Sequence, residues 1–208
     1  PAAIRTPSGS WWTRCASASA LRLTIVFGGT HATTALEMMR RMAVREIRLF
    51  GDPVLLSRAD EVTEFDATLG HLVDDMLETM DGAGGVGLAA NQVGVLQRVF
   101  VYDCDDVRGE LVNPVWEPVG EETETAEEGC LSIPAINADT ERFLKVRATG
   151  KNRHGEDVEL EAEGLLARCI QHETDHLDGV LFLKRLEPEV RKAAMRELRS
   201  ADWFTAGR

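Results

Sequence analysis

The pattern of hydrophobic and polar residues predicts helices and strands in separate stretches of this chain. From Asp66 to Met80 the apolar side chains recur at helical spacing, and Asp81-Gly82 then ends the run, which indicates an amphipathic helix. A glycine-rich loop follows over residues 82–87. The further expected elements are strands over 98–102 and 111–119, a hairpin of strands over 143–149 and 157–160, and helices over 164–177 and 187–199.

The order of these elements indicates the fold class. Strands and helices are segregated along the chain and do not alternate as β-α-β units would, so we expect an α+β fold. The strand over 111–119 is weakened by Pro114 and Pro118, which cannot donate a backbone hydrogen bond to a neighbouring strand. The helix over 187–199 places four apolar residues on one side: Val190, Ala193, Ala194 and Leu198.

Composition then narrows the class of protein. With 208 residues, of which 44% are hydrophobic and 28% charged, the chain is long enough for one well-packed domain. No stretch approaches the roughly 18 consecutive apolar residues that a membrane span needs, so we expect no membrane partner. The net charge of -12 argues against nucleic acid as a partner, because such binding needs clustered basic side chains. Four scattered cysteines indicate free thiols in a reducing compartment: Cys15, Cys104, Cys130 and Cys169.

The first part of the chain differs in composition from the rest. Residues 1–41 hold five arginines and a single acidic residue, Glu37, and show no sustained helical or strand period. Three interpretations compete: an organelle transit peptide, an extension from an upstream start, or a structured appendage. We favour the extension, because patterned sequence begins directly after Met42. The expected organisation is a poorly ordered leader over 1–41 and a folded domain over 42–208, located in the cytoplasm, or in an organelle if the leader is a transit peptide.

A metal-binding motif lies within the expected helix over 164–177. His172-Glu173-Thr174-Asp175-His176 is an H-E-x-x-H sequence, and histidines four residues apart project from one face of a helix at the separation that one metal ion needs. Buried imidazoles and a buried glutamate need partners, which a divalent cation supplies. The alternative, two ordinary helix histidines, requires Glu173 to face solvent. At helical spacing one side holds Leu165, Leu166, Cys169, Ile170, His172, Glu173, His176 and Leu177, and the other holds Ala167, Arg168, Gln171, Thr174, Asp175 and Asp178.

A catalytic metal site needs a third protein ligand and an open position for water. Phe182 stands where metzincin-like peptidases carry a third histidine, which excludes that family. Glu197 lies near the spacing of the third ligand in thermolysin-like peptidases, so a zinc endopeptidase is the alternative function. Arg196 and Arg199 flank Glu197, which favours an outward-facing glutamate. Cys130 is the remaining candidate for the third ligand.

A non-catalytic module with a structural metal ion is a further possibility. A closed structural site needs four protein ligands, and no fourth Cys or His stands near these motifs. Glu173 would also have no role in such a module. Both points favour an enzyme.

Three motifs together resemble those of a known family. They are Gly85-Val86-Gly87-Leu88-Ala89-Ala90-Asn91-Gln92, Glu128-Gly129-Cys130-Leu131-Ser132 and Gln171-His172-Glu173-Thr174-Asp175-His176. In order and approximate spacing they resemble the signature motifs of peptide deformylases, and the resemblance runs from about Val44 to Phe204. It implies that Cys130, His172 and His176 are the metal ligands. It also implies antiparallel β-sheets packed around a central H-E-x-x-H helix, with an N-terminal and a C-terminal helix.

The resemblance also implies an activity and roles for further residues. Peptide deformylases hydrolyse the N-formyl group of the N-terminal formylmethionine of nascent polypeptides and release formate. We therefore expect N-formylmethionyl peptides as substrates and transient association with the ribosome. Glu173 is the expected general base and then general acid, while Gln92 and the backbone N–H of Leu131 are expected to stabilise the oxyanion. Backbone groups of Val86 and Gly87 are expected to contact the peptide, and the methionine pocket is expected to be lined by Val86, Leu131, Leu165 and Cys169.

The expected cofactor is one divalent metal ion. Thiolate and imidazole suit Zn(II), Fe(II), Co(II) or Ni(II), and the resemblance implies Fe(II) in the cell. Two positions depart from well-known bacterial members of the family. Asn137 stands where they often carry an arginine, and Arg168 replaces an apolar residue on the metal-binding helix. Both departures bear on the rim of the expected substrate pocket.

Overall fold

Two antiparallel sheets form the β part of the molecule. The structure, a computed structural model, describes residues 44–205, and the expected leader over 1–41 lies outside the described residues. Neighbouring strands are antiparallel throughout both sheets, so the α+β prediction is confirmed. The five-stranded sheet has the order β1 (Gly87–Ala89), β2 (Val99–Cys104), β3 (Val107–Pro118), β6 (Lys145–Lys151) and β7 (Asp157–Glu163), and the smaller sheet pairs β4 (Thr123–Glu128) with β5 (Ala138–Phe143).

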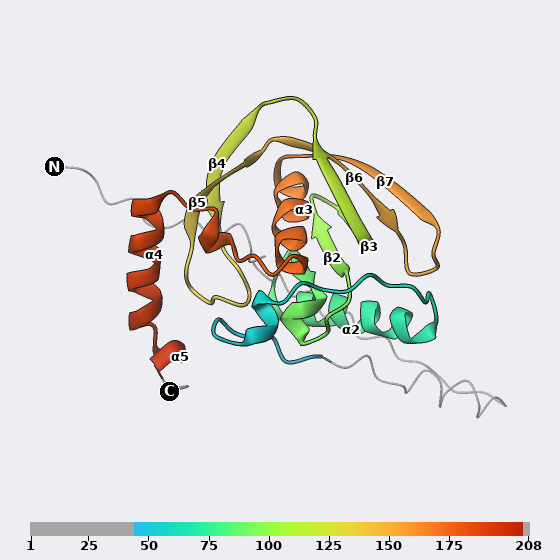
Figure 1. Cartoon of the computed structure of the whole chain (residues 1–208), viewed down its shortest axis with the longest axis horizontal. Coiled ribbons are helices and arrows are strands. Elements are labelled where there is room, and N and C mark those ends of the chain that lie inside the picture. The colour runs from blue at the N-terminus through green and yellow to red at the C-terminus, as the bar shows by residue number, and fades with distance from the viewer. Residues whose placement is uncertain (1–43, 206–208) are drawn as a thin grey trace, which may run out of the picture.

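One helix lies between the two sheets. It is α3 (Gly164–Leu177), which contacts β1, β2 and β3 of the larger sheet as well as β5 of the smaller one. Figure 1 shows α3 in orange at the centre of the molecule, with α4 at the outer edge. The prediction of a central helix between sheets is therefore confirmed. The other helices are α2 (Ala67–Ala83), α4 (Pro188–Ser200), α5 (Asp202–Thr205) and the short 3-10 helices η1 (Pro53–Leu56), η2 (Ala90–Val93) and η3 (Phe182–Lys184).

Helix α2 begins and ends at residues that the sequence marks clearly. The Asp66 carboxylate accepts hydrogen bonds from the backbone N–H groups of Thr68 and Leu69, at 2.9 and 3.1 Å, which satisfies donors at the helix N-terminus. Gly84 ends the helix at a φ of 68°, a left-handed conformation that glycine adopts without strain. The predicted helix is confirmed, and its apolar side packs into the core with β1 and β2. The expected loop over 82–87 is shorter than predicted, because α2 runs to Ala83 and β1 starts at Gly87.

Strand β3 contains the irregularity that its prolines suggest. Its pairing with β6 shifts register between Val112 and Val115, on either side of Pro114. Asn113 adopts a φ of 52°, and its side-chain amide exchanges two hydrogen bonds of 2.9 Å with the backbone of Val62. The Asn113 side chain thus supplies hydrogen-bond partners to the backbone of Val62 where the pairing of β3 with β6 is interrupted.

The β4–β5 sheet was not predicted from the sequence. Both strands are rich in charged residues and lack an alternation of apolar and polar positions. They pair along their whole length, from Thr123 opposite Phe143 to Glu128 opposite Ala138. Backbone hydrogen bonds between β4 and β5 and contacts with α3 therefore stabilise this sheet more than burial of apolar side chains does.

The C-terminal helix α4 was predicted with nearly the observed bounds. Ala194 and Leu198 are buried as expected, whereas Ala193 is exposed, because only a narrow side of α4 touches the core. The indole N–H of Trp203 donates a 3.0 Å hydrogen bond to the carbonyl oxygen of Pro134 and fixes the end of the described chain.

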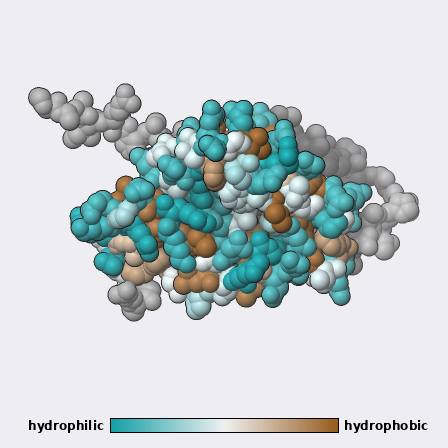
Figure 2. Space-filling model, turned by 45° about the horizontal axis from the view of Figure 1, so that its top comes forward, coloured by the Kyte–Doolittle hydropathy of each residue, from teal (hydrophilic) through white to brown (hydrophobic). Residues whose placement is uncertain are grey.

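No helix in the described part of the chain is long and apolar enough to cross a membrane. Figure 2 shows a largely hydrophilic face with small, separate hydrophobic patches.

Candidate active site

The structure brings Cys130, His172 and His176 together, and we call these three residues the donor cluster. Their ligand atoms all lie within 4.8 Å of one another, and all three side chains are buried. His176 Nε2 is 3.2 Å from Cys130 Sγ and 3.2 Å from His172 Nε2. Cys130 follows the end of β4, whereas the histidines project from one face of α3, as their spacing predicts.

The donor cluster fits a divalent metal ion. A sulfur and two imidazole nitrogens converge on one point, which is the donor set that suits zinc and the neighbouring first-row metals. His172 Nδ1 lies 2.6 Å from Glu128 Oε1, so the carboxylate orients the ring with Nε2 toward the cluster. Burial raises the pKa of the Cys130 thiol, so a thiolate at this position needs a cation beside it.

Glu173 lies beside the donor cluster in a buried position. Its side chain is 1% exposed, and its Oε2 has no hydrogen-bond partner among the described residues. Burial, the largest cause, raises the pKa of this carboxyl well above its usual range. The prediction that Glu173 faces inward is therefore confirmed, and a buried carboxyl with a free oxygen can exchange a proton with a group bound next to it.

Gln92 is held with its amide nitrogen toward the donor cluster. The backbone N–H of Ala89 donates a 2.8 Å hydrogen bond to Gln92 Oε1, which fixes the orientation of the side chain. Gln92 Nε2 then lies 3.2 Å from Ser132 Oγ and 3.7 Å from Cys130 Sγ. Leu131 directly follows Cys130 in the chain, so its backbone N–H also lies next to the cluster.

Three of the four side chains expected to line the substrate pocket gather where β1 meets α3. Val86 and Cys169 are buried, Leu165 is half-buried, and all three belong to one hydrophobic cluster. Leu131 packs on the other side of β1, against the residues that α2 covers. A Cβ built on Gly87 would lie 2.7 Å from Cys169 Sγ and closer still to the Glu173 carboxylate, so only glycine fits there.

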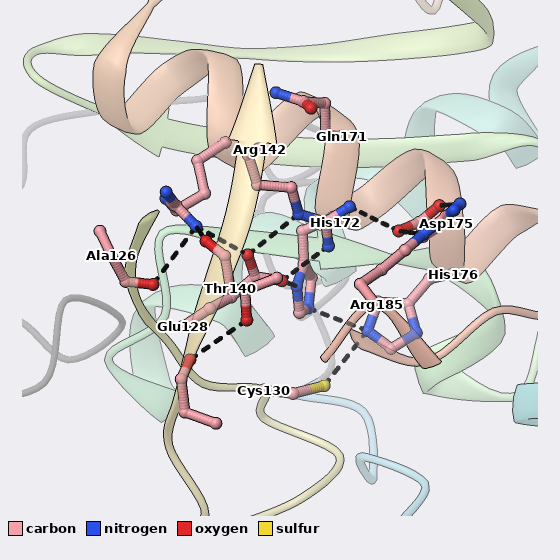
Figure 3. A network of polar contacts seen from close by, with 12 residues as sticks. Ala126, Glu128, Cys130, Thr140, Arg142, Gln171, His172, Asp175, His176 and Arg185 are labelled. Carbon is pink, nitrogen blue, oxygen red and sulfur yellow. Dashed lines mark hydrogen bonds and ion pairs between the residues drawn. The ribbon is translucent and has the colours of Figure 1, made fainter. Parts of the chain in front are cut away.

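A network of buried charges supports the histidines, and sequence reasoning did not identify it. Glu128 is fully buried, and Figure 3 shows its contacts with Arg142 and His172. Arg142 Nη2 lies 2.7 Å from Glu128 Oε1, and Arg142 Nη1 lies 2.7 Å from Asp175 Oδ2. Arg185 Nε binds the same Asp175 oxygen at 3.0 Å. Burial by itself would raise the pKa of Glu128, but the contact with His172 and, after it, the contact with Arg142 hold this pKa well below its usual range. Glu128 could have been noticed next to Cys130 in its motif, but no sequence signal connects it to Arg142.

The predicted division of α3 into an inward and an outward side is wrong. Most of the second side is buried too, because the β4–β5 sheet with Arg142, and Arg185 from the segment after η3, cover it. Asp178 alone among the residues of that side is exposed. The buried ones are Ala167, Arg168, Gln171, Thr174 and Asp175.

Three further positions bear on the sequence-based expectations: Arg168 corrects one, the exposed Glu197 agrees with the favoured interpretation, and the place of Asn137 at the rim stays a prediction. Arg168 does not lie at the pocket rim, because its guanidinium binds Glu128 and the backbone of β4 and β5. Asn137 is exposed in the segment before β5. Glu197 is exposed on α4, whereas the histidines are buried, so the structure does not bring the alternative third ligand to the metal motif.

Comparison with known proteins agrees with the geometry. Residues 44–192 match the sequence model of the family described as polypeptide deformylase. Peptide deformylase 1 of Corynebacterium efficiens is 65% identical over 167 residues, which cover 78% of this chain and 99% of that protein. Peptide deformylase of Acidothermus cellulolyticus is 57% identical over 162 residues, which cover 78% of this chain and 89% of that protein.

Solved structures agree as well. The crystal structure of a peptide deformylase from Legionella pneumophila aligns with a TM-score of 0.73 and 38% identity, covering 80% of this chain and 99% of that one. The structure of the Thermotoga maritima peptide deformylase aligns with a TM-score of 0.68 and 48% identity, covering 70% of this chain and 99% of that one.

Proposed function

This chain belongs to the polypeptide deformylase family, and we propose that its donor cluster holds the one divalent metal ion that the reaction needs. The chain is a peptide deformylase, a hydrolase that removes the N-formyl group. The convergence of three buried donor atoms beside a buried glutamate supports the proposal. A divalent ion at this place supplies a Lewis acid and lowers the pKa of a water molecule toward neutrality.

We assign the proton transfers to Glu173. Its free Oε2 accepts the proton of the attacking water, and the same carboxyl later delivers that proton to the departing amine nitrogen. The water oxygen forms a bond with the formyl carbon, the carbon–nitrogen bond breaks, and formate and a free N-terminal amine result. One buried residue therefore serves as base and then as acid.

Gln92 and Leu131 are proposed to stabilise the oxyanion that forms on the formyl oxygen. The Gln92 side chain cannot turn its oxygen toward the site without losing the hydrogen bond from Ala89. Its amide nitrogen is therefore preset as a donor, and the Leu131 N–H is a second donor next to Cys130. Donors that are fixed before the reaction need no reorganisation when the negative charge develops.

The substrate is proposed to be a peptide with an N-terminal formylmethionine. Strand β1 is the edge strand of its sheet, and among the described residues no strand pairs with its outer side, where an extended peptide could pair near Val86 and Gly87. The apolar side chains of Val86, Leu131, Leu165 and Cys169 offer an environment for the methionine side chain.

The identity of the metal and contact with the ribosome are two finer proposals. We propose Fe(II) as the metal in the cell, with Zn(II), Ni(II) and Co(II) as alternatives that the same donors accept. Anaerobic purification followed by metal analysis tests this. Transient contact of the enzyme with the ribosome is supported by four exposed basic residues on α4, in a chain of net charge -12: Arg191, Lys192, Arg196 and Arg199.

We also propose that residues 42–208 form the catalytic unit and that the enzyme works in the cytoplasm. The matched relative from Corynebacterium is covered almost completely by 78% of this chain, which supports a unit smaller than the whole sequence. Free cysteines among the described residues agree with a reducing compartment. A chain that begins at Met42 should match the full chain in solubility and in activity at equal metal content. Import of the full chain into an organelle would instead support a transit peptide.

The test of the proposed function is hydrolysis of formyl-Met-Ala-Ser by the full chain loaded anaerobically with Fe(II). We expect formate release by the parent, and loss of metal binding and of activity for Cys130→Ser. The matched control is Cys104→Ser, another buried cysteine that is not in the donor cluster, and it should keep both. Normal metal affinity and rate in Cys130→Ser would show that the donor cluster is assigned incorrectly.

A further inference from the structure

Arg168 is a buried arginine whose place in the structure the reaction does not explain. Arg168 is only 3% exposed. An arginine is rarely buried to this degree unless charged or polar groups pair with it. It lies on α3 one helical turn before His172, so the two side chains point to the same side of the helix. Arg168 does not touch the donor cluster itself, so any effect on the metal site must pass through other residues.

The guanidinium of Arg168 binds the small sheet at several points. Its Nη1 donates to the Thr140 carbonyl oxygen at 2.8 Å and to Glu128 Oε2 at 3.1 Å, and lies 3.5 Å from the Ala126 carbonyl oxygen. Its Nη2 donates to the Glu124 carbonyl oxygen at 2.9 Å. These acceptors belong to β4 and β5, so one side chain on α3 holds both strands.

The strand that Arg168 holds carries the third donor of the cluster. Strand β4 ends at Glu128, and Cys130 follows two residues later, whereas both histidines lie on α3. The distance between Cys130 Sγ and the histidine nitrogens is therefore set by how β4 sits on α3. Glu128 links Arg168 to the orientation of His172 as well as to the position of Cys130. It accepts a hydrogen bond from Arg168 through Oε2 and contacts His172 Nδ1 through Oε1.

Arg142 does not replace this contact. It comes from β5 and binds Glu128 and Asp175, so it ties the sheet to the part of α3 that follows His172. Arg168 ties the sheet to the part that precedes His172. The two arginines thus hold the small sheet against α3 both before and after His172. With one arginine alone, the sheet would be held to α3 at one end only.

We propose that Arg168 is a positioning residue that presets the place of Cys130 and the orientation of His172 for metal binding. This inference rests on the proposed role of the donor cluster. Loss of the guanidinium would free the end of β4 and remove one partner of Glu128. Glu128 is the direct partner of the ligand His172, and loss of such a partner typically costs 10–100-fold in metal affinity. Because Arg168 holds both Glu128 and β4, we expect the metal to leave the altered site at a rate near the lower end of that range, about tenfold faster.

The experiment compares Arg168→Met, Arg168→Lys and the parent, each loaded with Co(II). Release of cobalt into a chelator gives the rate, and the thiolate-to-cobalt absorption band reports whether Cys130 is bound. Arg168→Met should release the ion about tenfold faster, with a weaker or shifted band. Arg168→Lys should show an intermediate rate, because a lysine keeps the charge but not the planar fork of donors. Arg147→Met is the matched control, since Arg147 is partly exposed on β6 and binds only surface carboxylates; it should behave as the parent.

The metal-free proteins give a readout that does not depend on the loaded enzyme. Alkylation of Cys130, followed by peptide mapping, should be faster in Arg168→Met than in the parent, with buried Cys104 and Cys169 as internal references. Thermal unfolding of each protein identifies any general loss of stability, and if Arg168→Met does not fold, the Arg168→Lys results decide. Unchanged metal release and unchanged Cys130 alkylation in a folded variant would overturn the positioning role, even if stability falls. If Cys130→Ser keeps the parent cobalt spectrum, the donor cluster assignment fails instead.

Discussion

Two groups of arginine–carboxylate contacts in this protein differ strongly in burial and less strongly in distance. On the β6–β7 surface, Arg147 meets Glu117, Glu159 and Glu161 at 3.5, 3.4 and 2.8 Å, and its side chain is 41% exposed. Beside α3, Arg142 meets Glu128 and Asp175 at 2.7 Å each, and its side chain is 6% exposed.

The difference in burial decides what each group does. Water screens the contacts of Arg147, so they add little to stability, although the exposed charges along β7 protect that edge strand from pairing with other chains. The buried charges cannot be separated without leaving an uncompensated charge in the core, so their geometry is effectively fixed. The protein uses that fixed geometry next to the donor cluster, where the orientation of His172 matters.

The first prediction, with the largest expected effect, tests whether a buried charge matters more than an exposed one. It compares the buried Glu173 of α3 with the exposed Glu197 of α4. Glu173→Ala should keep the metal and lose deformylation by about 10²- to 10⁴-fold, because the proton acceptor is lost while the donor cluster remains. Glu197→Ala, on the exposed side of α4, should keep the parent rate. Metal content and rate are measured together. A rate within a few-fold of the parent in Glu173→Ala would remove the role assigned to it.

The second prediction compares carboxylates from the two ion-pair groups. Glu128→Ala leaves Arg142, Arg168 and His172 without their common partner, so we expect the free energy of unfolding of the metal-free protein to fall by about 3–5 kcal/mol. Glu161→Ala removes a partner of Arg147 and should leave the unfolding midpoint at the parent value within error. Chemical denaturation of both variants measures this. Equal losses would show that burial is not the deciding factor.

The third prediction, with the smallest expected effect, compares a glycine that lies against buried groups of the site with a glycine that has open space around it. Gly87→Ala places a Cβ against Cys169 and the Glu173 carboxylate, so we expect a loss of about 1–3 kcal/mol in stability together with a lower rate. Gly70→Ala lies in α2, where an added Cβ meets nothing within 4 Å, and should raise stability by about 0.5–1 kcal/mol. Thermal unfolding gives both values. Stabilisation by Gly87→Ala would show that the backbone can move away from Glu173.

The sequence predicted those parts of the molecule in which local pattern and tertiary environment agree. Helix α2 has a capping Asp66 and a regular apolar side, and the two histidines of α3 share a face because they are four residues apart. The pairing of β4 with β5 could not be predicted, since charged strands without alternation carry no periodic signal. Without that sheet, the sequence could not show which neighbours Arg168 contacts. Only the contact of its side chain with Thr140 and Glu128 shows that it faces the small sheet.

The separation of Cys130 from His176 by 46 positions along the chain has a consequence for the order of events during folding. Strands β5, β6 and β7 lie between these residues, so the three donors meet only when a long loop of the chain is closed. A preformed site is therefore rare in the unfolded chain, and binding of the ion is coupled to folding. The contacts of Glu128 with Arg142 and His172 need no ion, so the scaffold can close first. A newly synthesised chain would thus acquire its ion last, from whichever metals surround it at that moment.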